Sequence, residues 1–352
     1  MLPFYYAMLS SKSQNIYNAI LDAVANGKND VFVDLSCLQE DELNKIIEAV
    51  FDDNPQFYTE SNWKCTYTDK MLTFKTPIVS VYNSKEDIGF LLRFAQAVRK
   101  NCFTEYEKIK YVHDFMINSI KFDHEEIETK KFDRANHQAI GALYTGKSVC
   151  EGIARLTQLL LQMCGVQAIY CSGRTLDNDR DDDRESNGHA WTVVSINGKY
   201  YHLDVSHDIC LTKAKNQKSY CYFNLTYEDI IKDHQLDYDA EFRRLSCDSV
   251  HHNYFHYNKL LFSSLNELKI ALNTIVYGAI VDNDSSKFFQ FKVSNAMMKE
   301  FSIPWYQICL STIYEVIDKL ELENPSVGIG FDAPYYNDEQ GVFSINFTFG
   351  IP

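Results

Sequence analysis

The sequence predicts an α+β fold in which a central domain is flanked by two smaller α+β domains. Its 352 residues suffice for two or three domains. Amphipathic segments at helical spacing alternate with short strand-like runs along the chain. The dipeptide Asn197-Gly198, between two alternating apolar runs, is a strong β-hairpin signal. Together these observations favour a well-packed mixed fold.

Residues 1–83 are predicted to form the amino-terminal α+β domain. Ile16, Ile20 and Val24 recur on one face of a helix spanning 12–26, and Gly27 ends it. The other predicted elements are a strand at 31–35, a helix at 40–51, and strands at 57–66 and 72–82.

Residues 84–258 are predicted to form the central domain. Ser84 can cap a helix at 85–100, and Thr104 with Glu107 makes a capping-box pattern before a helix at 106–120. The further predicted elements are a loop at 123–136, a strongly apolar helix at 148–164, a strand at 167–172 and the hairpin around Asn197-Gly198.

Residues 259–352 are predicted to form the carboxy-terminal α+β domain. Its predicted elements are helices at 265–277 and 305–320 and strands at 288–293, 327–331 and 342–349. Gly278 is expected to end the first helix, and Pro304 precedes the second. The element order repeats that of the amino-terminal domain, and related flanking domains and chance similarity explain this equally well.

Composition bears on partners and compartment. Lys and Arg number 34 against 48 Asp and Glu, and the net charge of −14 argues against nucleic acid as a partner. No apolar run of about 18 residues is present, so no membrane segment is expected. The ten cysteines form no CxxC pair, so a structural zinc site of that type is not expected. Because the amino terminus has no leader-like pattern and no membrane segment is expected, the simplest interpretation is a cytoplasmic protein with reduced thiols. We expect no metal and no cofactor, and the oligomeric state stays open.

Cys150 is the candidate nucleophile, because it lies at the predicted start of the helix at 148–164. A thiol there meets the positive end of the helix dipole, which favours the thiolate. Free backbone N–H groups of the same turn can receive the oxyanion of an attacked carbonyl. For a single cysteine among ten, a buried structural role is the commoner alternative.

The hairpin places a base beside an acid. If Asn197-Gly198 is a two-residue turn, residues whose numbers sum to 395 lie opposite each other, so Trp191 faces Asp204. His189 is then the diagonal neighbour of Asp204 on the same face, within hydrogen-bond reach of its carboxylate. A lone histidine on an apolar strand is more often a core residue. With all three groups in this order, Cys150 would attack, His189 would transfer the proton, and Asp204 would orient the imidazole.

Three sequence blocks resemble the core of transglutaminase-like proteins, which share the papain-type cysteine-enzyme architecture. They are GALYTGKSVCEGIARLTQLLLQMCGVQAIYCSG, GHAWTVVSINGKYYHLDVSHD and YFNLTYEDIIKDH, within about residues 105–258. The resemblance implies a helix bearing Cys150 packed on an antiparallel sheet. It also implies a Cys150–His189–Asp204 triad that forms a thioester with an amide substrate. Many bacterial relatives place similar α+β segments before and after this core.

Two positions depart from the family pattern. Relatives usually read Thr-Trp-Asp where this chain has Ser206-His207-Asp208, so His207 is either neutral packing or a substrate contact. Relatives often carry tyrosine at the position of Ile140. Trp191 either shields a thioester or belongs to the core, and Gln138 is a weaker candidate for an oxyanion donor.

Two charged segments are further candidates. The acidic run 177–185, just before His189, is most simply a solvated loop; gating of the site, selection of cationic substrates and calcium binding are alternatives. His251, His252, His256 and Asp248 offer metal ligands at short spacing, but a surface or interdomain cluster is the default.

The leading functional hypothesis is a thiol enzyme that attacks a peptide or glutamine-type amide through a thioester. Hydrolysis by a peptidase or deamidase is favoured, because water is always available. An amine-transferring protein crosslinker is the first alternative. The second is a non-catalytic interaction module with a vestigial triad. The expected partner of the enzyme is a protein or peptide substrate.

Overall fold

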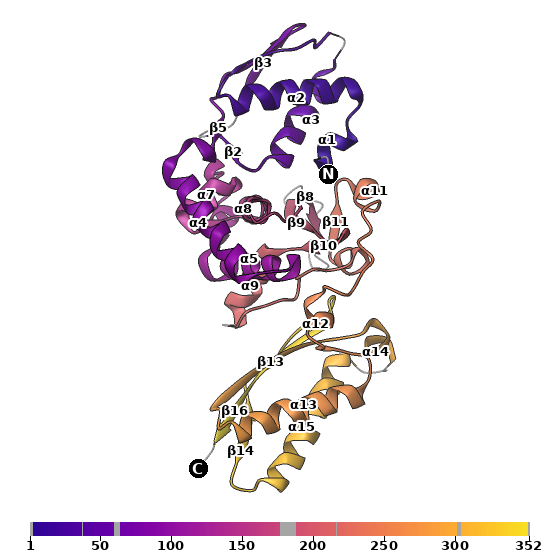
Figure 1. The fold of residues 1–352 in the computed structure, drawn as a ribbon. Coiled ribbons are helices and arrows are strands. Elements are labelled where there is room, and N and C mark those ends of the chain that lie inside the picture. Colours follow the sequence, from indigo (N-terminus) through magenta and orange to yellow (C-terminus); the bar gives the residue numbers. More distant parts are fainter. Residues whose placement is uncertain are drawn as a thin grey trace. The chain divides into compact units, whose positions relative to one another are not determined.

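The computed structural model describes residues 3–36, 38–59, 64–176, 188–215, 217–300 and 304–350. The chain divides into two compact units (Figure 1). The first comprises residues 1–214 and 222–249, and the second comprises 215–221 and 250–352. Both contain helices and strands, which confirms the predicted α+β class. The predicted three-domain division at 83 and 258 stays a prediction.

The first 83 residues contain a three-stranded antiparallel sheet in the order β1-β4-β3. Its elements are α1 (Phe4–Met8), α2 (Ser11–Ala25), β1 (Asp30–Phe32), α3 (Glu40–Asp53), β2 (Phe57–Tyr58), β3 (Cys65–Thr68), β4 (Met71–Phe74) and β5 (Val79–Ser80). The buried side chains of α2 include Ile16, Ile20 and Val24, so its apolar face is the one the spacing predicts.

The next helices pack around α8 (Cys150–Met163), which is buried along most of its length. They are α4 (Lys85–Asn101), α5 (Glu105–Ser119) and α7 (Ala139–Thr145) (Figure 1). The Thr104 and Glu107 capping box is present at the start of α5. The loop predicted at 123–136 is wrong in part, because it contains α6 (His124–Thr129) and a 3-10 turn at Arg134–His137. Asp123 caps α6 by accepting from the Glu126 N–H, a local bond that lets polar residues form a short helix.

A four-stranded antiparallel sheet packs against the other side of α8 (Figure 1). Its strands are β8 (Ala168–Thr175), β9 (Gly188–Ile196), β10 (Lys199–Leu203) and β11 (His234–Leu236), in the order β10-β9-β8-β11. The short elements around them are β6 (Lys121–Phe122), β7 (Lys147–Ser148), α9 (Val205–Lys215), α10 (Tyr227–Ile230) and α11 (Asp239–Phe242). A helix that begins with a cysteine thus packs on an antiparallel sheet, as the resemblance implies.

The predicted hairpin register is confirmed. Lys199 pairs with Ile196 and Leu203 pairs with Thr192, so residues summing to 395 lie opposite each other. Asn197 and Gly198 both have positive φ angles, 52° and 76°. A two-residue turn of this hand matches the right-handed twist of the strands, which fixes the register.

The second unit has its own core, formed where two long helices pack on a sheet. Its elements are α12 (Tyr254–Tyr257), β12 (Leu261–Phe262), α13 (Leu265–Val281), β13 (Ser286–Val293), α14 (Asn295–Glu300), α15 (Trp305–Glu323), β14 (Gly328–Phe331), β15 (Tyr335–Asn337) and β16 (Val342–Gly350). Gly278 does not end α13, because the apolar residues around it pack into the core and carry the helix to Val281. No helix among the described residues combines the length and apolarity needed to cross a bilayer.

Candidate active site

Cys150 is the first residue of α8, where the sequence places it. Its thiol is free and its side chain is partly exposed. An α-helix leaves the N–H groups of its first turn without intrahelical partners and carries partial positive charge there. The sulfur, and an oxyanion formed beside it, therefore lie at the electrostatically favourable end of α8.

The start of α8 is held tightly against the segment before it. The Ser148 hydroxyl donates a 2.5 Å hydrogen bond to the carbonyl oxygen of Asn136, and both residues are buried. Gly152 lies against the same carbonyl: a Cβ on Gly152 would lie 2.4 Å from the Asn136 oxygen and 2.2 Å from the Ser148 hydroxyl. Only glycine fits there, and the close approach fixes the backbone next to Cys150.

We expect Gly152→Ala to lower the free energy of unfolding by about 1–3 kcal/mol, because the added methyl overpacks a backbone contact. Alkylation of Cys150 should slow as the start of α8 shifts. The control is Gly89→Ala in α4, where the contact is the end of the flexible Arg93 side chain, 3.3 Å away. Urea unfolding of both variants checks the prediction, and equal midpoints would contradict it.

A chain of ion pairs surrounds the residue after the nucleophile. Glu151 accepts from His137 Nδ1 at 2.9 Å, and His137 Nε2 lies 2.9 Å from a Glu126 oxygen. Arg155 donates to Glu151 at 3.0 Å and to Asp52, in α3, at 2.8 Å. Burial by itself lowers the pKa of His137, but its bonds to the two glutamates outweigh burial and raise it. This network ties the amino-terminal segment to the helix that carries Cys150.

His189 and Asp204 form the hydrogen bond that the hairpin register predicts. His189 Nε2 lies 2.6 Å from Asp204 Oδ2, and Asp204 is completely buried. Cys150 lies close enough to this imidazole to contribute to the raised pKa of His189. The three residues proposed from the sequence as a triad are therefore brought together, in the order thiol, imidazole, carboxylate.

Electrostatics favour a protonated His189 beside an ionised Asp204. Burial by itself lowers the pKa of His189, but the charge of Asp204 and the hydrogen bonds to Asp204 and Cys150 outweigh it, so the pKa is raised. Burial by itself raises the pKa of Asp204, but the charges of His207 and His189 bring it well below its usual range. Asp204 thus stays ionised and stabilises the imidazolium of His189.

Asp204 has more partners than a simple triad requires. Its Oδ1 accepts from the Ser206 hydroxyl at 2.7 Å and from the His207 N–H at 3.0 Å. Its Oδ2 lies 2.6 Å from His207 Nδ1 and 3.1 Å from His234 Nε2. His207 therefore contacts the acid itself. His234, the first residue of β11, is absent from the sequence-based candidates, although it lies within the quoted block YFNLTYEDIIKDH.

Two further candidates have their own partners. Trp191 is buried, stacks on His189 with ring centroids 5.8 Å apart, and donates from Nε1 to His202 Nδ1 at 3.0 Å. Burial, then the charge of His234, lowers the pKa of His202 to about 3, so this imidazole is a neutral acceptor. Trp191 is thus a buried packing residue beside the His189 imidazole.

Gln138 lies in a different environment. Its Nε2 donates to the carbonyl oxygens of Thr59 at 2.8 Å and Arg134 at 2.9 Å, and its oxygen accepts from the Thr59 N–H at 2.7 Å. Both amide hydrogens are therefore used to hold backbone, and the suggested oxyanion donation has no support in this geometry. Ile140 is buried in α7.

The structure describes only one of the two charged segments that the sequence singles out as candidates. The acidic run 177–185 lies outside the described residues. The rings of His251 and His256 contact each other edge to face, with centroids 5.5 Å apart. Among the described residues, the group able to hold a metal ion is a different one, made of His189, Asp204, His207 and His234.

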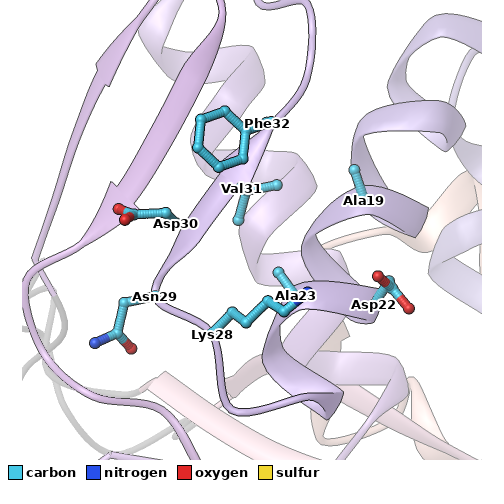
Figure 2. Close-up of a pocket in the computed structure, with 8 residues that line it drawn as sticks. All are labelled: Ala19, Asp22, Ala23, Lys28, Asn29, Asp30, Val31 and Phe32. Carbon is cyan, nitrogen blue, oxygen red and sulfur yellow. The ribbon is translucent and has the colours of Figure 1, made fainter.

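A cavity of about 540 Å³ opens from the residue that follows the nucleophile. Its lining residues are Glu48, Phe51, Asp52, Arg134, Glu151, Arg155, Tyr170, Ser172, Asp237 and Tyr238. Four of these are acids and two are arginines, so the lining is net negative. The hollow in Figure 2, of about 580 Å³, lies at α2 and β1, and its lining contains neither a thiol nor an imidazole.

Comparison with solved structures gives partial matches. A crystal structure of a TGase is 13% identical with a TM-score of 0.28, and the match covers 48% of each chain. A candidate cysteine protease from Cytophaga hutchinsonii is 14% identical with a TM-score of 0.24, over 41% of this chain and 61% of that one. A candidate protease from Parabacteroides distasonis is 12% identical with a TM-score of 0.25, over 42% and 36%. The chain thus spans between about a third and three fifths of those proteins.

Part of the chain matches a protein-family model. The model of the Transglutaminase-like superfamily matches residues 92–205, a span that runs from α4 to the start of α9 and contains Cys150, His189 and Asp204. No curated protein matches the chain. Residues 92–205, about a third of the chain, are thus similar to the transglutaminase-like superfamily.

Proposed function

We propose that the protein is a thiol acyl-transfer enzyme that hydrolyses a peptide or glutamine-type amide. The observation that carries the proposal is the 2.6 Å contact of His189 Nε2 with the buried Asp204 carboxylate, with Cys150 close enough to affect the same imidazole. The Cys150 thiolate attacks the amide carbon, and the tetrahedral oxyanion accepts N–H bonds at the start of α8. The His189 imidazolium gives its proton to the departing ammonia or amine, leaving a thioester on the sulfur. Water, deprotonated by His189, then releases the acid and restores the thiolate.

The acidic cavity beside Glu151 supports a protein or peptide substrate with a basic segment. Glu48 and Asp237 line it together with the paired Asp52, Glu151 and Arg155, and a net negative lining attracts cations. The same attraction favours the second candidate function, amine transfer, because a lysine side chain docked there would compete with water for the thioester. All described cysteines are free, which supports the cytoplasm as the proposed compartment.

We expect Cys150 to react with iodoacetamide faster than the other described thiols, because its side chain is partly exposed at the start of α8 and lies beside His189. His189→Ala should slow this reaction by at least about tenfold near pH 7, and the exposed-site variant His124→Ala should not. Peptide mapping by mass spectrometry after timed alkylation measures each cysteine separately. If Cys150 reacts no faster than the buried thiols, the non-catalytic interaction module becomes the better description.

The products distinguish hydrolysis from transfer. Glutamine-containing peptides with basic flanks are incubated with the protein, with and without a labelled primary amine, and released ammonia is measured beside label incorporation. Hydrolysis predicts ammonia with little incorporated label, and transfer predicts label equal to ammonia. Cys150→Ala is the control for both. A reactive Cys150 with no product from amide peptides would contradict the proposed substrate class.

A further inference from the structure

Asp204 and the three imidazoles around it converge on one point. The donor atoms are His189 Nε2, Asp204 Oδ2, His207 Nδ1 and His234 Nε2, and they all lie within 4.8 Å of one another. His189 Nε2 and His207 Nδ1 are 3.2 Å apart, and each is 2.6 Å from the carboxylate oxygen. His234 Nε2 approaches the same oxygen at 3.1 Å.

Two of these separations, 3.2 and 3.1 Å, are close to those of a tetrahedral metal site, and the two 2.6 Å separations would widen on binding. A zinc ion held at about 2.0–2.1 Å by nitrogen and oxygen donors places those donors roughly 3.3 Å apart. The carboxylate oxygen meanwhile faces three imidazole nitrogens, more than its two lone pairs accept well. One cation at the centre would receive a lone pair from each of the four atoms and relieve that crowding.

The second shell has the form that metal-binding histidines need. His234 is completely buried, and its Nδ1 lies 2.5 Å from an Asp233 oxygen. A carboxylate on the remote nitrogen fixes the tautomer so that the near nitrogen presents a lone pair. Asp233 is held in turn by the Tyr222 hydroxyl at 2.7 Å. A bond from Ser206 orients the Asp204 carboxylate in the same way.

An ion has a route to this point. The side chains of Asp204 and His234 are completely buried, whereas the His207 side chain is 31% exposed and that of His189 is 9% exposed. Asp204 and His234 would thus be ligands fixed in the interior, whereas His207 and His189 lie on the side that solvent reaches. Spacing along the sequence does not indicate the site, because its members lie in β9, directly before α9, in α9 and in β11, and they follow no metal-ligand motif.

We propose that His189, Asp204, His207 and His234 bind one divalent transition-metal ion, with Zn²⁺ as the best match to the donors. A bound ion occupies the nitrogen of His189 that faces Asp204 and removes the carboxylate from its role as orienting group. Metal binding and proton transfer through His189 are then mutually exclusive. This consequence for catalysis rests on the proposed function; the binding site itself does not.

The test measures Zn²⁺ binding directly on the full chain without an affinity tag. Equilibrium dialysis after removal of metals with a chelator is expected to give one ion per chain. Co²⁺, as a spectroscopic substitute, should give the intense visible absorption of four-coordinate geometry. We expect His207→Ala to weaken binding at least about 100-fold and Asp233→Asn by about 10–100-fold. The control His124→Ala, an exposed imidazole outside the cluster, should bind as the unaltered chain does.

Several results would overturn the proposal. Absence of saturable binding would do so, as would equal affinity in His207→Ala, whose folding is checked by circular dichroism. Loss of binding in Cys150→Ala would overturn the four-residue ligand set, because it would make the thiolate a ligand.

The regulatory consequence has a separate measurement. Zn²⁺ is expected to slow alkylation of Cys150 in the unaltered chain but not in His207→Ala, and a chelator should restore the rate. Zinc binding without an effect on alkylation would refute the mutual exclusion of metal binding and proton transfer through His189. The metal site itself would remain supported. If Cys150 is unreactive in the metal-free chain, the proposed function fails, and dialysis still decides the metal site.

Discussion

Replacing Asp204 by Asn is expected to slow acylation of Cys150 by about 10³–10⁴-fold, the largest effect among our predictions. The substitution keeps the shape of the side chain but removes the charge that raises the pKa of His189. An amide can also favour the wrong tautomer of the His189 imidazole, because it presents N–H donors where the carboxylate only accepts hydrogen bonds. The measurement is the single-turnover rate of thioester formation in metal-free buffer, with a pH profile from 5.5 to 8.5.

The matched control for Asp204→Asn is Ser206→Ala, which removes one hydrogen bond to Asp204 Oδ1 and leaves its charge intact. We expect that control to lose less than about tenfold, in line with about 1 kcal/mol for one hydrogen bond. Removing a buried carboxylate beneath imidazolium groups also costs stability, about 3–5 kcal/mol. Unfolding curves therefore accompany the rates, and a folded Asp204→Asn protein within tenfold of the normal rate would refute the role assigned to Asp204.

The second large effect is a loss of stability as pH rises, and its source is His234. Burial by itself lowers the pKa of His234, but the hydrogen bonds to Asp204 and Asp233 outweigh it and raise the pKa to about 9. The folded pKa then exceeds the unfolded value of about 6.5, so the folded state holds the proton more tightly. The stabilisation is complete below about pH 6.5 and is lost as pH rises through about 9; in total it is worth about 3 kcal/mol.

Urea unfolding between pH 6.5 and 8.5, in the presence of a chelator, measures this effect. The free energy of unfolding should fall with pH, and His234→Gln should make that fall shallower by up to about 1.4 kcal/mol per pH unit. The raised pKa of His189 contributes in the same direction, so some slope remains in the variant. The control His124→Ala, whose side chain is exposed, should follow the unaltered chain. If the free energy of unfolding fell equally with pH in the unaltered chain and in His234→Gln, the prediction would be contradicted.

The parts of the site that local sequence determines were predictable. Asn197 and Gly198 favour a turn with two positive φ angles, and that turn fixes which residues of β9 and β10 face each other. The hydrogen bond between His189 and Asp204 then follows from counting along two strands. The position of Cys150 at a helix start follows equally from the apolar pattern of α8 and the polar residues before it.

The parts that depend on distant pairing were not predictable. His234 reaches Asp204 because β11 pairs with β8, with His234 opposite Thr175, and no local signal selects that partner. Gln138 is held by Thr59, 79 positions away, so its sequence context cannot show that its amide is already used. The ring of His207 turns to Asp204 because residues three apart meet at the start of α9, a helix that the polar sequence did not predict.

The position of β11 in the sequence also sets the order in which the parts of the site are synthesised. The hairpin of β9 and β10 is complete once Leu203 has left the ribosome, so His189 and Asp204 can meet early. The edge strand beside β8 is the last of the four to emerge, and His234 arrives with it. A nascent chain therefore carries its nucleophile, base and acid before it carries the buried imidazole that completes their surroundings. A fragment meant to reproduce the site has to extend through Leu236, well beyond the family match that ends at residue 205.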